Sequence, residues 1–390
     1  MENIGNKKIM DKNTVIWWII GIVLLLLMIA LHFKSMLAGM DALLIIAFFL
    51  IIYKARVQKS GFFPDYIARN STSAINGIFI LLILFTHAYG YMNVTADNMP
   101  LFFFFRSHCR QLVVTTFLFY SGYGIMESVK KKGVSYINSM PLKRVLPLWI
   151  KFAIAVCIFA VIMLAFGQDV TVGRFIGSLL TWKNVGNSNW YVTAILILYL
   201  IAYVSFRAFG SVSQKAAIVF SVLGTFVFIM ILIHFRETES YTYNTIFCFP
   251  AGIIYSYYKE RIEKLVQNSR FSYWTTLVTS ILVFLIAYGV CDNYGKFWNL
   301  FWYQIMCIAF ALMLTFLAMK LKFENRFLLF LGGPMLFSIY ILMRIPMNIL
   351  SWSEAAVSPS VFFVVSAIVT ILIAWVFTKL TNGLIKRVFK

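Results

Sequence analysis

Charged residues are scarce in this sequence. They make up 12% of its 390 residues, whereas an ordinary soluble domain contains roughly a quarter. Hydrophobic residues account for 61%, and only 14 residues are acidic. A water-soluble fold of this size cannot hide so much apolar surface, so the composition excludes a soluble enzyme and predicts an integral membrane protein.

Metal-binding and redox motifs are also missing. The five cysteines show no C-x-x-C spacing, and three of them lie inside apolar runs, where a thiol acts as a small hydrophobe. No metal site is therefore predicted. Cys109 and Cys291 both fall near the predicted outer surface, which leaves a disulfide between them open.

Long polar stretches are absent too, because apolar runs recur along the whole chain. Backbone polar groups cannot stay unpaired in hydrocarbon, so each run is predicted to be a helix. The first run follows Lys7, Lys8 and Lys12, lacks a small-x-small cleavage site and is interpreted as a retained helix. The twelve runs lie at 15–32, 38–53, 73–92, 110–127, 145–166, 190–208, 215–234, 244–258, 273–291, 298–318, 328–349 and 359–380.

The basic residues predict how these helices are oriented. The net charge is +20, but the cations lie in clusters between the spans, a pattern typical of membrane orientation and not of nucleic-acid binding. With both termini cytoplasmic, the inner segments hold 26 Lys and Arg residues. The outer segments and outer helix halves then hold only eight, which are Lys34, Arg106, Arg110, Arg174, Lys183, Arg236, Lys296 and Arg344.

His87 is the most conspicuous polar residue within a predicted span. Ionisable groups are costly in a membrane and are functional candidates for that reason. A neutral imidazole can take a proton from a hydroxyl and return it, which is what acyl transfer to an alcohol requires. The alternative, a histidine hydrogen-bonded to a neighbouring carbonyl for packing, stays open from this residue alone.

Small and basic residues mark the cytoplasmic side. Ser121, Gly122 and Tyr123 lie in the inner half of the fourth run, where small residues also suit ordinary helix packing. Lys143 and Arg144 follow in a basic loop before Pro147, together with the run Lys130, Lys131 and Lys132. Such a rim suits the phosphates of a donor such as a coenzyme A thioester, because guanidinium binds phosphate oxygens in a bidentate way. The bias of cations toward the inside explains it equally well.

Aromatic and amide side chains mark the outer rim. Asn189, Trp190 and Tyr191 stand at the mouth of the sixth run, and Tyr340 and Arg344 lie in the eleventh. These groups can hold a sugar, although Trp and Tyr also populate membrane interfaces as an aromatic belt. Arg344 needs partners inside the bundle, because it stands among Ile, Leu and Met residues.

From about Ser73 to Leu380, these segments together resemble the acyltransferase 3 family of bacterial membrane enzymes, which move acyl groups, commonly acetyl, onto extracytoplasmic carbohydrates. Five pieces carry the resemblance, in the family's order. They are the eleven-residue spacing from Asn76 to His87, the Ser121-Gly122-Tyr123 triplet, Lys143-Arg144 before Pro147, Trp190-Tyr191, and Leu331-Gly332 followed by Ser338, Tyr340, Leu342 and Pro346.

The resemblance implies an all-α transmembrane bundle with both termini cytoplasmic, made of a ten-helix core at 70–390 after two additional helices at 1–60. It implies a multi-pass O-acyltransferase of the bacterial cell membrane, commonly transferring acetyl, that uses acyl-CoA as co-substrate and no bound cofactor. The acceptor would be a cell-surface or lipid-linked glycan. By resemblance His87 is the general base or acyl relay; Asn76, Ser121, Gly122, Tyr123, Lys143 and Arg144 serve the donor; and Asn189, Trp190, Tyr191, Tyr340 and Arg344 serve the acceptor.

The sequence also departs from the family pattern. Asn76 stands where the family usually has a cation, Pro141 where it usually has an arginine, and Arg344 where it often has a histidine. Two interpretations stay open. Either Lys143, Arg144 and the lysine run bind the donor instead, or the enzyme is impaired.

Other function classes are not excluded by the sequence. Twelve helices with both termini inside is also a common transporter or flippase plan, but internal repeats are not visible, and Asp41 is the one clear carboxylate within a span. A catalytically silent relative used in assembly or sensing is suggested by Asn76. The oligomeric state is not predicted by any of these features.

Overall fold

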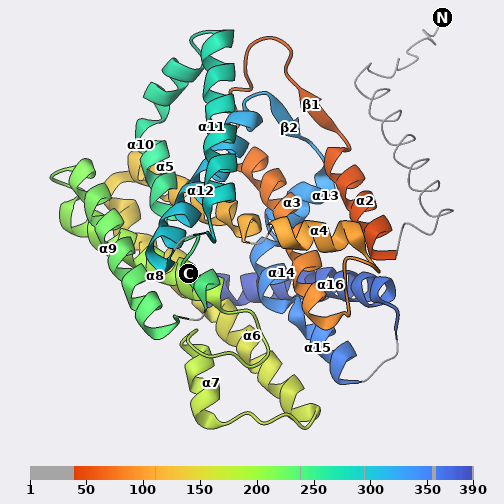
Figure 1. Ribbon diagram of the computed structural model, residues 1–390. Helices are drawn as coiled ribbons and strands as arrows, with labels where there is room; N and C mark the ends of the chain where they lie inside the picture. The colour runs from red at the N-terminus through yellow and green to blue at the C-terminus, as the bar shows by residue number, and fades with distance from the viewer. Residues whose placement is uncertain (1–38, 110, 238, 294, 354–356, 389–390) are drawn as a thin grey trace, which may run out of the picture.

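The computed structural model describes residues 39–388 apart from 110, 238, 294 and 354–356. In this part of the chain nearly all regular structure is helical, and the helices pack into one bundle (Figure 1). The predicted first span at 15–32, and with it most of the predicted two-helix addition at 1–60, lies outside the described residues.

Each predicted run after residue 38 overlaps a helix or a set of short helices. Among the described residues, seven helical stretches are long and apolar enough to cross a membrane, or eight if one bent pair counts as a span. The multi-pass helical architecture is confirmed, while the total of twelve spans and the side of the termini stay predictions. The helices are α2 (Gly39–Ile52), α3 (Arg69–Ala88), α4 (Pro100–Cys109), α5 (Leu112–Met140), α6 (Leu146–Ala165), α7 (Val172–Leu179), α8 (Trp190–Phe209), α9 (Gln214–Phe235), α10 (Cys248–Val266), α11 (Arg270–Val290), α12 (Lys296–Ala318), α13 (Arg326–Gly332), α14 (Leu336–Leu342), α15 (Arg344–Trp352) and α16 (Pro359–Val388).

One helical stretch, Leu112–Ala165, contains two of the predicted spans. It is 54 residues long, and at about 1.5 Å per residue it could extend about 80 Å, more than twice the thickness of the hydrocarbon core. It is interrupted at Gly133, whose φ of 55° and ψ of −139° are not helical. A π-helical turn at Pro141–Val145 then leads into α6, where Pro147 again lacks a backbone donor. Arg144 stands in this turn.

The predicted span 328–349 is a broken helix. Arg326–Gly332 and Leu336–Trp352 meet at an angle of 65°, and the second part is interrupted again between α14 and α15. Pro346 has no N–H to donate to the carbonyl of Leu342, so the regular pattern of α14 ends at that residue. The carbonyl of Met343 accepts a hydrogen bond from the Thr370 hydroxyl on α16 at 3.5 Å. The break leaves Arg344 at the first turn of α15, inside the bundle.

Glycines allow two pairs of helices to touch through their backbones. A Cβ on Gly122 of α5 would lie 1.9 Å from the carbonyl oxygen of Phe249 on α10, and one on Gly252 of α10 would lie 1.9 Å from a carbonyl oxygen of α5. At the crossing of α3 and α13, a Cβ on Gly77 would lie 2.0 Å from a carbonyl oxygen of α13, and Gly332 abuts the backbone of α3. Small residues are the usual means of close approach between membrane helices.

The all-α prediction misses one small element. Strands β1 (Ala55–Val57) and β2 (Leu321–Phe323) form a two-stranded antiparallel sheet that joins the loop after α2 to the loop after α12 (Figure 1). An ion pair of 3.0 Å between Arg56 and Glu324 spans the two loops. Three residues are too few to show an alternating pattern in the sequence. These strands therefore form because two distant loops pair with each other.

Asp41, the carboxylate predicted within a span, has a structural role. Its side chain is fully buried, and Oδ1 accepts a hydrogen bond of 2.8 Å from the backbone N–H of Phe102 in the first turn of α4. A carboxylate is stabilised at the N-terminus of a helix, where backbone N–H groups lack partners. Asp41 therefore ties α2 to α4, the helix that carries Arg106.

Two glycines of α5 provide a test of the helix crossing. We expect Gly122→Ala to destabilise the protein by about 1–3 kcal/mol, the usual cost of overpacking, because the new methyl group meets the α10 backbone. Gly124→Ala is the matched control, since a Cβ there meets nothing within 4 Å, and it should be neutral or stabilising by up to about 1 kcal/mol. Thermal unfolding of the detergent-purified variants checks this, and equal melting temperatures would contradict the close crossing.

Candidate active site at the end of helix α3

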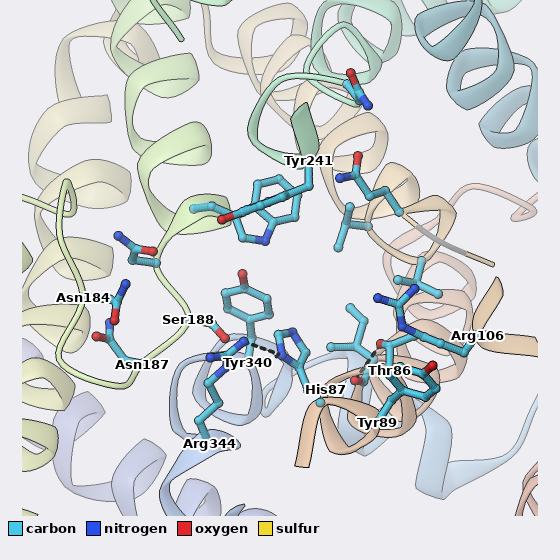
Figure 2. A pocket seen from close by; sticks show the side chains of 18 of the residues that line it. Thr86, His87, Tyr89, Arg106, Asn184, Asn187, Ser188, Tyr241, Tyr340 and Arg344 are labelled. Carbon is cyan, nitrogen blue, oxygen red and sulfur yellow. Dashed lines mark hydrogen bonds between the residues drawn. The ribbon is translucent and has the colours of Figure 1, made fainter. Parts of the chain in front are cut away.

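A cavity of about 530 Å³ lies where the C-terminal end of α3 meets α5, α14, α15 and two loops (Figure 2). Five residues predicted from the sequence line it, namely His87, Asn189, Trp190, Tyr340 and Arg344. Exposed side chains of Asn184 and Tyr241 also line it, so its rim reaches the protein surface. The fold thus brings residues of the third, sixth and eleventh predicted runs into one site.

His87 and Arg344 are in direct contact inside this cavity. The guanidinium of Arg344 donates to Nδ1 of His87 from Nε at 3.4 Å and from Nη2 at 3.3 Å (Figure 2). Guanidinium has no acceptor atom, so Nδ1 must be the accepting nitrogen and the neutral ring carries its proton on Nε2. Both hydrogen bonds are long, so the contact is weak and open to exchange with a ligand.

The helix that carries Arg344 is held by a chain of amide and hydroxyl groups. The Tyr91 hydroxyl donates to Oδ1 of Asn348 on α15 at 2.6 Å. The amide of the same Asn348 donates to the carbonyl of Gly186 at 3.1 Å. Gly186 has a φ of 84°, which an L side chain rarely adopts. These contacts hold α15 against the end of α3 and against the loop before α8.

Arg106 also lines the cavity, although it was not among the site residues predicted from the sequence. Its guanidinium lies 5.3 Å from the centre of the Tyr89 ring, and its Nε atom is buried without a hydrogen-bond partner. Asn184 and Tyr241 were not predicted either, whereas Asn187 and Ser188 directly precede Asn189 in the predicted rim segment. Only the scarcity of outer cations could have singled out Arg106. The others come from loops whose positions depend on the whole fold.

Asn189 and Tyr191 are less directly placed for an acceptor than their neighbour Trp190. The Asn189 amide donates to the carbonyls of Thr181 and Lys183, both at 2.8 Å, and so closes the loop before α8. Tyr191 lies behind the cavity wall, with its ring 5.2 Å from that of Tyr340. The Trp190 ring itself faces the cavity and lies 6.3 Å from the ring of Tyr241.

Ser121 and Arg144 lie along a column of tyrosines that leads away from the cavity. Behind Tyr340 comes Tyr191, whose hydroxyl lies beside that of Ser121. Ser121 also lies beside the hydroxyl of Tyr199, which is in turn next to the Arg144 guanidinium. The structure therefore aligns two predicted donor residues with two predicted acceptor residues through the interior of the bundle.

The other predicted donor residues are dispersed. Gly122 packs against the backbone of α10. The ring of Tyr123 lies 6.3 Å, between ring centres, from that of Tyr255 on α10. Successive residues of a helix point about 100° apart, which is why Ser121 alone of the triplet faces the tyrosine column. Lys143 is exposed. The side-chain oxygen Oδ1 of Asn76 is buried on α3 without a hydrogen-bond partner among the described residues.

The nearby lysine run and the cysteines have simpler roles. Lys130 donates to the carbonyl of Ser256 on α10 and to the Glu127 carboxylate, the latter at 3.2 Å, while Lys131 and Lys132 are exposed. Cys109 and Cys291 are thiols and form no disulfide with each other. Burial raises the pKa of the Cys109 thiol to about 11, so it is not a reactive thiolate at neutral pH.

Comparison with protein families decides the class of this protein. A family model described as an acyltransferase domain, Acyl_transf_3, matches residues 73–379, well over half of the chain. The chain belongs to the acyltransferase 3 family. This confirms the resemblance carried by the sequence motifs and the expectation of a membrane acyltransferase. No curated protein and no solved structure matches the chain.

The contact within this acyltransferase 3 site predicts a single tautomer of His87. Solid-state ¹⁵N NMR of histidine-labelled protein, with His87→Asn as the spectrum that assigns the signal, should show Nδ1 unprotonated and Nε2 protonated. Arg344→Leu removes the donors and should allow both tautomers. A protonated Nδ1 in the unchanged protein would contradict the arrangement.

Proposed function

We propose that this chain is an O-acyltransferase that moves an acyl group, most simply acetyl, from cytoplasmic acyl-CoA to a hydroxyl of an extracytoplasmic carbohydrate. The observation that carries the proposal is the His87 imidazole, which contacts Arg344 and lines a cavity with a rim at the protein surface. Family membership supplies the general chemistry of acyl transfer. The geometry supports a role for His87 in handling the proton of the acceptor.

The reaction requires two successive proton transfers, from the acceptor hydroxyl to His87 and then to the departing thiolate. His87 accepts the proton of the acceptor hydroxyl while the hydroxyl oxygen attacks the thioester carbonyl. The C–S bond then breaks, and His87 passes the proton to the departing thiolate. The free lone pair of the neutral ring is on Nδ1, which receives the Arg344 hydrogen bonds. Arg344 must therefore turn away from Nδ1 when the acceptor arrives. The released guanidinium can then stabilise the oxyanion that develops on the carbonyl.

The donor would approach from the end of the bundle that carries Arg144. This arginine stands in the π-helical turn beside the hydroxyls of Tyr136 and Tyr199, where it can meet a phosphate. Asn76 and His87 are eleven residues apart on α3, which corresponds to about 16 Å along the helix axis. A pantetheine arm can cover that length. The tyrosine column, with Ser121, would offer hydroxyl groups to that arm between Arg144 and the cavity.

The acceptor would enter through the exposed rim of the cavity. The rings of Trp190 and Tyr241 offer faces on which a sugar can stack, and several amides and hydroxyls nearby can bind its hydroxyl groups. With the basic loops in the cytoplasm, this rim faces outward. The protein would then act as a multi-pass enzyme of the bacterial cell membrane on a surface or lipid-linked glycan.

His87→Ala tests the catalytic step. We expect acyl transfer to fall by about 10²- to 10⁴-fold, the usual contribution of a general base, while the protein still inserts and folds. His108→Ala is the control, because this exposed histidine stacks on Phe104 at 4.0 Å and does not line the cavity. Mass spectrometry of surface glycans for the lost ester, together with coenzyme A release by purified protein, measures the effect. Full retention of product would remove His87 from the mechanism.

Arg144→Gln tests the donor side. Loss of a charge-assisted contact to phosphate, worth about 1.5–3 kcal/mol, should raise the KM for acyl-CoA by about tenfold or more with little change in kcat. Lys215→Gln is the control, an exposed cation at the start of α9. Steady-state kinetics with varied acyl-CoA checks this. An unchanged KM would exclude Arg144 from the donor site.

A further inference from the structure

Cations on the side opposite the basic loops gather around two cavities. Orientation in the membrane favours few Lys or Arg residues there, and the structure describes the side chains of five of the eight that the sequence assigns to it. All five line one cavity or the other. Arg106 and Arg344 belong to the cavity at His87. Arg174, Lys183 and Arg236 belong to a shallow depression of about 610 Å³ that is open at the protein surface, called the second cavity below.

The two cavities adjoin at Asn184, which lines both. The second also contains the Trp182 ring, over which the Arg236 guanidinium lies at 4.6 Å from the ring centre. The Arg236 guanidinium forms an ion pair of 2.6 Å with Glu239, which neutralises its charge. Lys183 is exposed in the second cavity. A ligand of several sugar units could extend from the first cavity into the second.

The charge in the cavity at His87 is uncompensated. Neither Asp nor Glu is among the residues that line it. Arg106 lies over the Tyr89 ring with its Nε unpartnered, and Arg344 donates to a neutral imidazole. Within the described part of the chain, neither guanidinium forms an ion pair. Removing such a group from water is costly unless an anion accompanies it, so a bound anion would stabilise this arrangement.

We infer that the acceptor is an anionic glycan, whose carboxylate or phosphate binds Arg106 and Arg344 beside His87 and whose further units follow the second cavity. This inference rests on the proposed function and names its substrate class. Guanidinium is suited to both anions, because its planar fork matches their oxygens. The ring of Trp190 would provide a stacking face for a sugar ring.

The donor is a poorer source for this anion than the acceptor. The phosphates of coenzyme A are separated from the reacting sulfur by the whole pantetheine arm, so a thioester at His87 brings no phosphate with it. The cavity instead reaches the surface at Asn184 and Tyr241. An anion arriving from there meets the two guanidinium groups directly.

The same anion would couple acceptor binding to chemistry. Arg344 holds Nδ1 of His87 through hydrogen bonds of 3.3 and 3.4 Å, which are weaker than a charge-assisted contact with a carboxylate or phosphate. An arriving anion would therefore draw the guanidinium from Nδ1. The lone pair that must accept the hydroxyl proton becomes free only when an acceptor is present.

Binding to the purified full-length protein in nanodiscs tests the inference without relying on catalysis. The probes are an oligogalacturonate of six sugars, its fully methyl-esterified form, and a glycerol phosphate oligomer of similar length. We expect at least one anionic probe to bind about tenfold or more tightly than the ester, and the stronger one identifies carboxylate or phosphate as the natural anion. Equal binding of all three probes, or no binding by either anionic probe, would overturn the inference.

Variants of Arg106 assign the effect to the cavity. Arg106→Gln should reduce the preference for the anionic probe about tenfold, and Arg106→Lys should retain most of it because the charge remains. Lys386→Gln is the control, an exposed cation at the far end of α16. Melting temperatures of all variants exclude unfolding as the cause. A preference that survives Arg106→Gln unchanged would overturn the inference.

Acyl transfer to the same probes separates this inference from the proposed function. Anion-selective binding without transfer from acyl-CoA would contradict the proposed function while the anion site stands. Transfer to the ester and to the free acid with equal kcat/KM would contradict the anion site while the acyltransferase activity stands.

Discussion

The contact between the Arg344 guanidinium and the His87 imidazole is the interaction on which the rest of the site depends. Two polar groups meet among helices that are otherwise apolar, and neither can be left without a partner there. Much of the surrounding architecture holds them in place. Gly77 lets α13 approach α3 closely, and Asn348 ties α15 to the end of α3 and to the loop before α8.

A helix interruption accompanies each of two arginines, of which Arg344 lies inside the bundle and Arg144 is exposed. A proline frees a carbonyl that needs a new partner, and a membrane protein can supply one only where the segment is enclosed by protein. Pro346 ends α14 and leaves Arg344 at a new helix start, while Pro141 and Pro147 flank the π-helical turn that carries Arg144. The two arginines thus occupy two irregular segments that are linked by the column of tyrosines.

The distribution of cations has two different causes at the two ends of the bundle. On the side of the basic loops the lysines and arginines are numerous and mostly exposed, as orientation in a membrane requires. On the other side they are few in the sequence, and those whose side chains the structure describes line two adjoining cavities, one of which contains His87. A rule for orientation does not account for this second group. Ligand binding is the physical reason that we assign to it.

The amino-acid sequence was enough to predict the membrane class, the approximate helix boundaries after residue 38, the family, and the unusual positions of His87 and Arg344. These properties follow from local sums of hydropathy and from short motifs, which require no knowledge of packing. The broken helix at 328–349 was not foreseen as broken, although Pro346 was visible, because a proline alone does not reveal whether neighbouring helices will satisfy the freed carbonyl.

Which of these residues meet depends on long-range packing. His87 and Arg344 are 257 positions apart, and Arg106, Asn184 and Tyr241 reach the same cavity from separate segments. The separation of Ser121 from Gly122 and Tyr123 likewise depends on which face of α5 is turned toward α8 and which toward α10. A cavity is the space left by several helices packed at particular angles, and those angles arise from long-range contacts that a linear pattern does not contain.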